Sequence, residues 1–308
     1  MNKVNISPIL YMGNKSRLIR RGLTNLFPNN INRFIDAFAG SATVSMNIKA
    51  NKYIINDIDE TLHSYYAIFS KMDKKAISGH IKQRILEFEL PTKTTIRCFS
   101  DNKEVEKYKK AYHNFRDFYN SNKTPLDLYT LMFFAFSQQF RVNKNGDFNM
   151  PFGNNHFSKN NEESISNGCD FFSRENIEIY KKDFQKLFSD IDLNTDDFVY
   201  FDPPYRITLA TYNENSSWNE DNDQRLFYTC KKLHKEGVKF GMSNVIINKG
   251  IINKELIDFC LLNNFNVYMP NDFKYHACGK ENIEQQEVYI CNYEIKNTNH
   301  KFRKTLLK

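Results

Sequence analysis

Residues 33–57 read RFIDAFAGSATVSMNIKANKYIIND, and this stretch decides the fold class. The runs at 33–38 and 52–57 are short and apolar, and each ends in an acid or a turn, as buried strands do. Residues 42–50, between them, are expected to form a helix. Strand, helix and strand in this order make a βαβ unit, which favours a parallel sheet.

The rest of the chain alternates in the same way, except for one long interruption. From about 68 to 139 the apolar spacing is helical, and residues 143–153 are rich in Asn, Gly and Pro, which indicates a hairpin or long loop. Further strands are expected at 177–180, 198–202, 238–242, 265–269 and 287–293. Helices are expected at 81–88, 105–119, 126–140, 221–235 and 254–263. We therefore predict an α/β protein: a doubly wound, Rossmann-like sheet, mostly parallel, with an antiparallel last strand at its edge and an inserted helical domain.

The composition is that of an ordinary globular chain with a basic bias. Hydrophobic residues make up 41% of the 308 residues, and the net charge is +7 with a pI of about 8.9. Residues 68–160 hold 16 Lys/Arg against 9 Asp/Glu, so this segment carries the whole excess. A polyanionic partner explains that bias, and so does a solvated helical surface.

Nothing in the sequence indicates export or a metal site. Residues 1–10 lack the basic-then-apolar pattern of a secretory signal, so an intracellular, cytoplasmic protein is expected. The cysteines form no CxxC pair, which favours buried free thiols over zinc ligands. They are Cys98, Cys169, Cys230, Cys260, Cys278 and Cys291.

The tetrapeptide Asp202-Pro203-Pro204-Tyr205 is the sharpest motif, and it follows the predicted strand that ends at Phe201. Two prolines stop a strand and fix an extended turn. A plain Asp-Pro turn is the structural alternative. In such sheets ligands bind beyond the carboxyl ends of the strands, where this motif falls.

The motif resembles the DPPY sequence of the D12-class, Dam-like DNA N6-adenine methyltransferases, and the similarity runs through most of the chain in that family's order. It implies that Asp202 and the carbonyl of Pro203 accept the two N–H bonds of an adenine amino group, that Pro204 aims this carbonyl, and that Tyr205 stacks on the base. An aspartate at the first position favours adenine. The base must leave the duplex before it can react.

The resemblance also implies a site for S-adenosylmethionine. The family's acid-x-Phe-x-Gly loop appears at 36–40. Asp57 corresponds to the acid that accepts the ribose hydroxyls. Residues 11–15 correspond to the N-terminal motif that closes over the cofactor, with Lys15 reaching its methionine carboxylate. Asp183 and Phe184 are implied to hold the cofactor adenine. The full expected set is Tyr11, Lys15, Asp36, Ala37, Phe38, Gly40, Asp57, Asp183, Phe184 and Asp202.

Three of these residues also have a structural explanation. Asp57 could cap the following helix, Lys15 could lie on the surface, and Phe184 could pack in the core. Ala42 replaces the last glycine of the family loop. Ser243 and Asn244 match a supporting motif, and the strand at 287–293 is expected to be purely structural.

The segment 141–153 resembles the family's target-recognition hairpin. By that match Arg141 contacts a guanine, with Asn143 and Pro151 nearby; arginine pairs with guanine and asparagine with adenine in the major groove. The stretch 136–140 departs from the family pattern, so GATC is only a first candidate for the recognition sequence. Candidates for phosphate contacts are Lys144, Arg116, Lys107, Lys109 and Lys110, and a merely solvated side chain is the alternative for each of them.

The sequence therefore predicts a site-specific adenine methyltransferase. Residues 1–67 and 161–308 would form the catalytic domain, and residues 68–160 the recognition domain. Double-stranded DNA is the expected partner, and a cognate restriction endonuclease is a candidate partner. An RNA N6-adenine methyltransferase and a non-catalytic DNA-binding protein of this fold are the alternatives. Trp218, the only tryptophan, either orders its loop on DNA or anchors it.

Overall fold

The chain forms two compact units in the computed structural model. The first comprises Met1–Asn14, Gly40–Met46 and Asp59–Glu175, and the second comprises Lys15–Ala39, Asn47–Ile58 and Asn176–Lys308. The segment 68–160 thus lies wholly within the first unit, which also extends beyond it. The structure describes residues 4–11, 13–93, 102–138, 140–153, 155–209, 218–271, 285–295 and 301–305.

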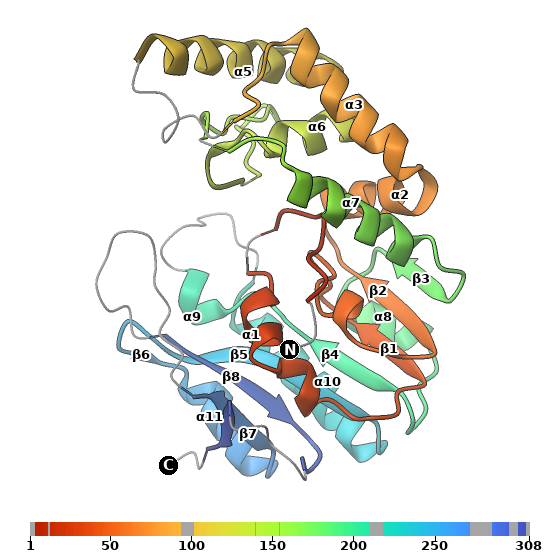
Figure 1. Cartoon of the computed structure of the whole chain (residues 1–308). Helices are drawn as coiled ribbons and strands as arrows, with labels where there is room; N and C mark the ends of the chain where they lie inside the picture. The colour runs from red at the N-terminus through yellow and green to blue at the C-terminus, as the bar shows by residue number, and fades with distance from the viewer. Residues whose placement is uncertain are drawn as a thin grey trace. The chain divides into compact units, whose positions relative to one another are not determined.

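A mixed sheet forms the second unit and confirms the expected α/β fold (Figure 1). Its order is β3-β2-β1-β4-β5-β8-β7-β9, with β6 paired to β5. The first five strands in this order are parallel: β3 (Ile177–Tyr180), β2 (Lys52–Asn56), β1 (Arg33–Asp36), β4 (Phe198–Phe201) and β5 (Lys239–Asn248). The antiparallel pairs involve β6 (Ile251–Ile252), β7 (Asn266–Pro270), β8 (Gln285–Cys291) and β9 (Phe302–Lys304).

The last long strand, β8, is antiparallel as expected, but its predicted place at the sheet edge is wrong. It lies between β5 and β7. Four consecutive residues of β8, from Val288 to Cys291, are each at most 2% exposed. A strand that is apolar on both faces is more stable inside a sheet than at its rim. The edge goes instead to β9, in which only Phe302 is buried.

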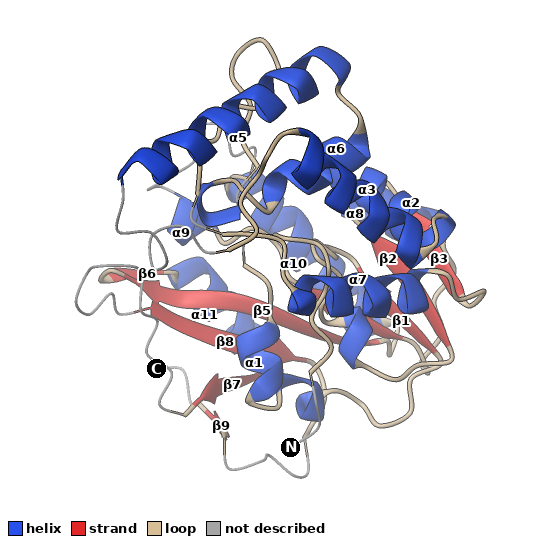
Figure 2. Cartoon of the chain, turned by 45° about the horizontal axis from the view of Figure 1, so that its top comes forward, coloured by secondary structure: helices blue, strands red, loops and turns tan. Residues whose placement is uncertain are grey.

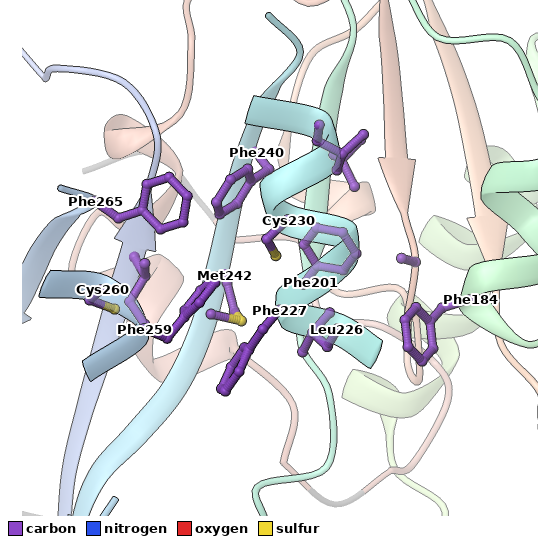
Figure 3. Close-up of a cluster of buried hydrophobic side chains, with 14 of the residues drawn as sticks. Phe184, Phe201, Leu226, Phe227, Cys230, Phe240, Met242, Phe259, Cys260 and Phe265 are labelled. Atoms are coloured by element: carbon purple, nitrogen blue, oxygen red, sulfur yellow. The ribbon is translucent and has the colours of Figure 1, made fainter. Parts of the chain in front are cut away.

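Successive side chains of the central strands point to opposite faces of the sheet and so form two apolar layers. Val199 and Phe201 of β4 join one layer with α8 (Phe184–Asp190), α10 (Glu220–Lys235) and α11 (Lys254–Leu262), as Figure 3 shows for part of it. In that layer Phe227 and Phe259 stack with ring centroids 4.2 Å apart. Phe198 and Tyr200 alternate with this pair and meet Phe27 at centroid distances of 4.9 and 5.3 Å.

The helix predicted at 42–50 is wrong. Only the short 3-10 turn η2 (Ser45–Asn47) forms there. Ala42 has a φ of 54°, the left-handed region that a helix cannot contain. The helix predicted at 126–140 is also too long, because α6 (Pro125–Met132) stops early and Ser137 and Gln138 both have a φ of 53°.

Helices build the first unit (Figure 2). They are α2 (Glu60–Lys71), α3 (Lys74–Glu87), α5 (Asn102–Asn122), α6 and α7 (Lys159–Phe172). Aromatic rings form its core: Tyr129 lies edge-on to Tyr65 and Phe69, each at 5.4 Å, and its hydroxyl donates to the carbonyl of Pro8. The remaining short helices are α1 (Ser16–Arg20), η1 (Leu23–Leu26) and α9 (Arg206–Leu209) in the second unit and the 3-10 turn η3 (Phe136–Gln138) in the first.

The described cysteines are buried, as expected. Cys169, Cys230, Cys260 and Cys291 all carry free thiols, whereas Cys98 and Cys278 lie outside the described residues. Burial raises the pKa of the Cys169 thiol to about 11, which disfavours the reactive thiolate. Among the described helices none is long and apolar enough to cross a membrane.

A buried carboxylate, Asp127, joins two helices of the first unit. It is 1% exposed and accepts hydrogen bonds from His80 (2.8 Å) and Arg84 (2.7 Å) of α3 and from Thr124 (2.7 Å), the cap of its own helix α6. Burial alone would raise the pKa of Asp127, but these hydrogen bonds outweigh it and hold the pKa well below its ordinary value.

We expect Asp127→Asn to lower the free energy of unfolding of the chain by about 2–3 kcal/mol at neutral pH, because Arg84 then loses its buried partner. Denaturant unfolding measures the change. A depressed folded-state pKa contributes stability above the unfolded value of about 3.9, and this contribution is lost as the pH falls through the folded value. The deficit should therefore shrink in acid. The exposed Asp117→Asn is the control, and a deficit equal to its own would contradict the assigned role.

Candidate active site

Acidic residues line one edge of the parallel sheet in the second unit. Asp36 is the last residue of β1, and Asp57 and Asp202 directly follow β2 and β4. Asp183 comes shortly after β3, the neighbour of β2. Because these four strands are parallel and adjacent, the four carboxylates fall at the same, carboxyl, edge, where doubly wound sheets bind ligands.

Asn56, which the sequence reasoning passed over, holds two of these strand-end loops together. Its side chain is 1% exposed and donates to the carbonyls of Ala37 and Lys182, each at 3.0 Å. Its Oδ1 accepts from the backbone N–H of Lys182 at 3.1 Å, and its own carbonyl accepts from Ala39. The loops after β1 and β3 are thereby fixed to the end of β2.

An aromatic group lies beside these loops. Phe38 and Phe184 have ring centroids 5.2 Å apart, and Trp218 meets them at 5.5 and 5.9 Å. The indole N–H of Trp218 donates to Asp223 at 2.8 Å. Trp218 itself is therefore held in place, but its effect on the preceding loop stays open, because residues 210–217 lie outside the described residues. Phe184 is 3% exposed and belongs to the core as well as to this group.

The carboxylate of Asp183 is engaged by the protein itself. It accepts from the backbone N–H of Gln185, which caps α8, and from Arg225 of α10 at 2.6 Å. The guanidinium of Arg225 also lies over the ring of Phe184, 5.1 Å from its centroid. A cofactor amino group at Asp183 would have to share this carboxylate with Arg225.

Asp57 was one candidate for the N-cap of the helix after β2, but a different acid caps that helix. Asp59 accepts from the backbone N–H groups of Thr61 and Leu62 at the start of α2. Asp57 is not the cap, so this structural explanation for Asp57 is removed. Its predicted role toward the ribose of the cofactor stays a prediction.

A cluster of charged and hydroxyl groups surrounds Asp202. The Lys15 ammonium lies 2.7 Å from one carboxylate oxygen, and the Tyr205 hydroxyl donates to the other at 2.8 Å. Glu287 of β8 accepts from the same Tyr205 hydroxyl at 3.0 Å and lies 3.6 Å from Lys15. In the turn itself Pro203 is buried and Pro204 is exposed. The cluster holds Asp202 in one orientation at the end of β4.

Burial and charge act together on this cluster. Side-chain exposure is 6% for Lys15 and 11% for Glu287. Burial opposes the charge of Lys15, but Asp202 and Glu287 outweigh it and raise the pKa of the ammonium above its ordinary value. Burial raises the pKa of Glu287, with Lys15 acting against the rise. Lys15 is therefore no surface lysine, and its predicted contact with a methionine carboxylate would add to these pairs.

Two further residues of the supporting motif are buried nearby in β5. The hydroxyl of Ser243 pairs with that of Tyr200 at 2.6 Å, and Asn244 is 4% exposed with its Oδ1 accepting from the N–H of Val245. Both stabilise the strand beside β4, which agrees with a supporting role.

Tyr11 and Gly40 belong together in the first unit. Gly40 has a φ of 51°, and a Cβ added there would lie 3.2 Å from the Tyr11 ring. Its carbonyl accepts from the buried hydroxyl of Tyr66 at 2.6 Å. The glycine is thus required both by its backbone conformation and by the ring against it. The cofactor roles of both residues stay predictions from the resemblance.

The predicted recognition segment is a hairpin-like loop anchored to α5. Isolated bridges join Val142 with Phe148 and Ala135 with Phe152. Asn120 of α5 donates to the carbonyl of Phe148 at 3.1 Å and accepts from its N–H at 2.8 Å. The helix thereby holds the base of the loop rigidly.

The polar side chains of this loop differ in their availability. Arg141 is exposed, and Asn149 braces its guanidinium through two hydrogen bonds of 2.8 and 3.1 Å. Asn143 instead accepts from the backbone N–H groups of Asn145 and Asp147, so its side chain builds the turn. Lys144 and Pro151 are exposed, and Arg116 pairs with Asp117 on α5. The predicted contact of Arg141 with a guanine stays a prediction, and its exposed guanidinium is compatible with it.

Comparison with known proteins assigns the chain to a family. The model of the D12 class N6 adenine-specific DNA methyltransferase family matches residues 11–276. The chain is 35% identical to modification methylase StsI of Streptococcus sanguinis, over 95% of this chain and 44% of that protein. It is 33% identical to type II methyltransferase M.FokI of Planomicrobium okeanokoites, over 93% of this chain and 43% of that protein. The chain belongs to the D12 class N6 adenine-specific DNA methyltransferase family.

The relatives differ in length. The chain spans less than half of StsI and M.FokI. It covers 84% of type II methyltransferase M.MjaIII of Methanocaldococcus jannaschii, at 28% identity over 78% of this chain.

We expect Asn56→Ala to reduce the free energy of unfolding by about 2 kcal/mol, because it leaves backbone groups of the loops after β1 and β3 without their partner. The same change should weaken binding of S-adenosylhomocysteine, measured by calorimetry, since the loops after β1 and β3 lose their tie. Asn176→Ala, which removes one exposed bond to the carbonyl of Asn51, is the control. Unchanged binding would show that Asn56 supports only the fold.

Proposed function

We propose that this chain transfers a methyl group from S-adenosylmethionine to the N6 amino group of an adenine flipped out of a specific site in duplex DNA. One observation carries the proposal. The carboxylate of Asp202 is held by Lys15 and Tyr205 at the carboxyl edge of the sheet, directly after β4. An orientation fixed in advance is what an amino-group acceptor needs.

The residues at this edge suit S-adenosylmethionine. Carboxylates at Asp36 and Asp57 suit amino and hydroxyl groups, and the rings of Phe38 and Phe184 suit a purine. Lys15 suits a carboxylate. S-adenosylmethionine supplies the electrophilic methyl group.

The catalytic turn suits an adenine amino group. The lone pair of N6 is delocalised into the ring, which makes the amino group a poor nucleophile. Asp202 and the carbonyl of Pro203 would accept its two N–H bonds and favour a pyramidal nitrogen whose lone pair faces the donor. Tyr205, with its hydroxyl held by Asp202 and Glu287, would offer a fixed ring for stacking.

The first unit would supply the DNA contacts. Arg141 would bond a guanine in the major groove, and exposed lysines of α5 would contact phosphates. Such a hairpin does not suit RNA, since the major groove of an A-form duplex is too narrow to read. The segments 68–160 and 1–67 with 161–308 would then divide recognition from catalysis as the sequence predicted.

The names of the relatives guide the wider setting. StsI is a modification methylase and M.FokI a type II methyltransferase. We propose by analogy that this chain acts in the cytoplasm beside a cognate restriction endonuclease, whose site it would protect.

The decisive experiment is transfer of labelled methyl from S-adenosylmethionine to unmethylated duplex DNA, with the modified base identified by mass spectrometry and located by sequencing. N6-methyladenine at one short recurring sequence is expected. Methylation of RNA in place of DNA, or of a different base, would overturn the proposal.

We expect Asp202→Ala to abolish transfer, with a fall of about 10³-fold or more in the single-turnover rate, while DNA binding survives. The rate is measured with labelled donor, and binding by fluorescence anisotropy. Asp258→Ala, an exposed acid of α11, should leave both unchanged. Joint loss of transfer and DNA binding would instead assign Asp202 a purely structural role.

Arg141→Ala should lower discrimination at one guanine of the recognition sequence by about 1–3 kcal/mol, because its two hydrogen bonds to the base edge are lost. Competition between the native site and sites with that base changed measures the difference. Lys144→Ala is the matched control, since loss of a phosphate contact weakens all sequences alike and reduces the salt dependence. A uniform loss for Arg141→Ala would refute base reading.

A further inference from the structure

The cluster around Asp202 contains one carboxylate more than the placement of Asp202 requires. Lys15 and Tyr205 already occupy the two oxygens of Asp202. Glu287 of β8 is a second acid in this cluster. Its side chain is 11% exposed and contacts both Lys15 and Tyr205. In the sequence it stands alone as a charged residue at the head of the apolar run EVYIC.

The charges of this cluster do not cancel when both acids are ionised. Among the residues that the structure describes, one ammonium of this cluster faces two carboxylates, which leaves a net charge of −1 in a largely buried place. A buried charge that lacks a counterion is costly. The surplus therefore favours a ligand that brings a positive charge to this edge of the sheet.

The methyl donor carries one positive charge more than its product. S-adenosylmethionine has a sulfonium centre, whereas S-adenosylhomocysteine has a neutral thioether. In a near-attack geometry the methyl carbon lies about 3–3.5 Å from the accepting nitrogen. With N6 bonded to Asp202, the sulfonium would lie within a few bond lengths of the cluster.

We propose that the carboxylate of Glu287 makes the site select the cationic methyl donor over the neutral product. This inference rests on the proposed function and adds the residue that sets the donor-to-product preference. Glu287 does not touch the reacting atoms; it acts through the local charge that it shares with Lys15 and Asp202. Release of the product is favoured because the loss of the sulfonium removes the attraction.

A neutral isostere separates charge from shape. Glu287→Gln keeps an oxygen that can accept from the Tyr205 hydroxyl and removes only the charge. Glu287→Asp keeps the charge on a shorter side chain. Glu236→Gln is the matched control, because this exposed acid precedes β5 and so lies at the amino edge of the parallel strands, opposite to Asp202.

Calorimetry on the full chain tests the proposal with three probes. These are S-adenosylmethionine, S-adenosylhomocysteine and sinefungin, in which a protonated amine replaces the methylsulfonium. Glu287→Gln should weaken both cationic probes by about tenfold and leave the thioether within about twofold. Glu287→Asp should restore most of the preference, and Glu236→Gln should match the wild type.

Equal weakening of all three probes by Glu287→Gln would overturn the inference and assign Glu287 a structural role. So would an unchanged preference in that variant. Both results leave the proposed function standing, provided that the wild type binds the donor. A wild-type chain that binds none of the probes would overturn the inference and the proposed function together.

Discussion

A buried ammonium, that of Lys15, is the constraint on which the candidate site depends. It is 6% exposed and lies between Asp202 and Glu287. A buried charge without partners costs several kcal/mol, so the segment before α1, the turn after β4 and the start of β8 must meet. The position of Asp202 thus follows from tertiary contacts, and the two prolines alone would not fix it.

The remaining contacts at this edge are hydrogen bonds between side chains and the backbone. The backbone of a loop that follows a strand has no neighbouring strand to bond to, so its N–H and C=O groups need other hydrogen-bond partners when they are buried. Asn56 supplies them for the loops after β1 and β3, and Arg225 binds the cap of α8 at Asp183. The edge is therefore largely assembled by the protein's own hydrogen bonds, and ligand groups would add to a formed frame.

The sequence predicted the strands well because their apolar runs are short and end in polar turns. The strand at 177–180 matches β3 residue for residue, and those at 33–38, 52–57 and 198–202 differ from β1, β2 and β4 only at their ends. It failed at 42–50, where the spacing looked helical but Ala42 takes a left-handed conformation. The spacing of apolar residues does not show that a residue adopts a left-handed backbone conformation.

The candidate site was predictable where a motif carried it and not where partners came from distant segments. Asp202 and Tyr205 stood in a recognisable tetrapeptide. Glu287 was expected to be structural, because only the pairing of β8 with β5 brings it to the cluster. Asn143 was predicted to lie near a DNA base, yet its Oδ1 accepts backbone hydrogen bonds and closes a turn. The sequence alone does not distinguish an asparagine that builds a turn from one that contacts DNA.

The predicted recognition loop is hydrogen-bonded to the basic helix α5. Asn120 bonds both backbone groups of Phe148, and the hydroxyl of Tyr112, also on α5, donates to the carbonyl of Met150 at 2.9 Å. Arg141 is in turn braced by Asn149 within the loop. In the proposed complex, phosphate contacts from α5 would set the register in which Arg141 meets a base, because phosphate contacts orient a protein and base contacts specify the sequence. Specificity would then depend on this helix as much as on the arginine.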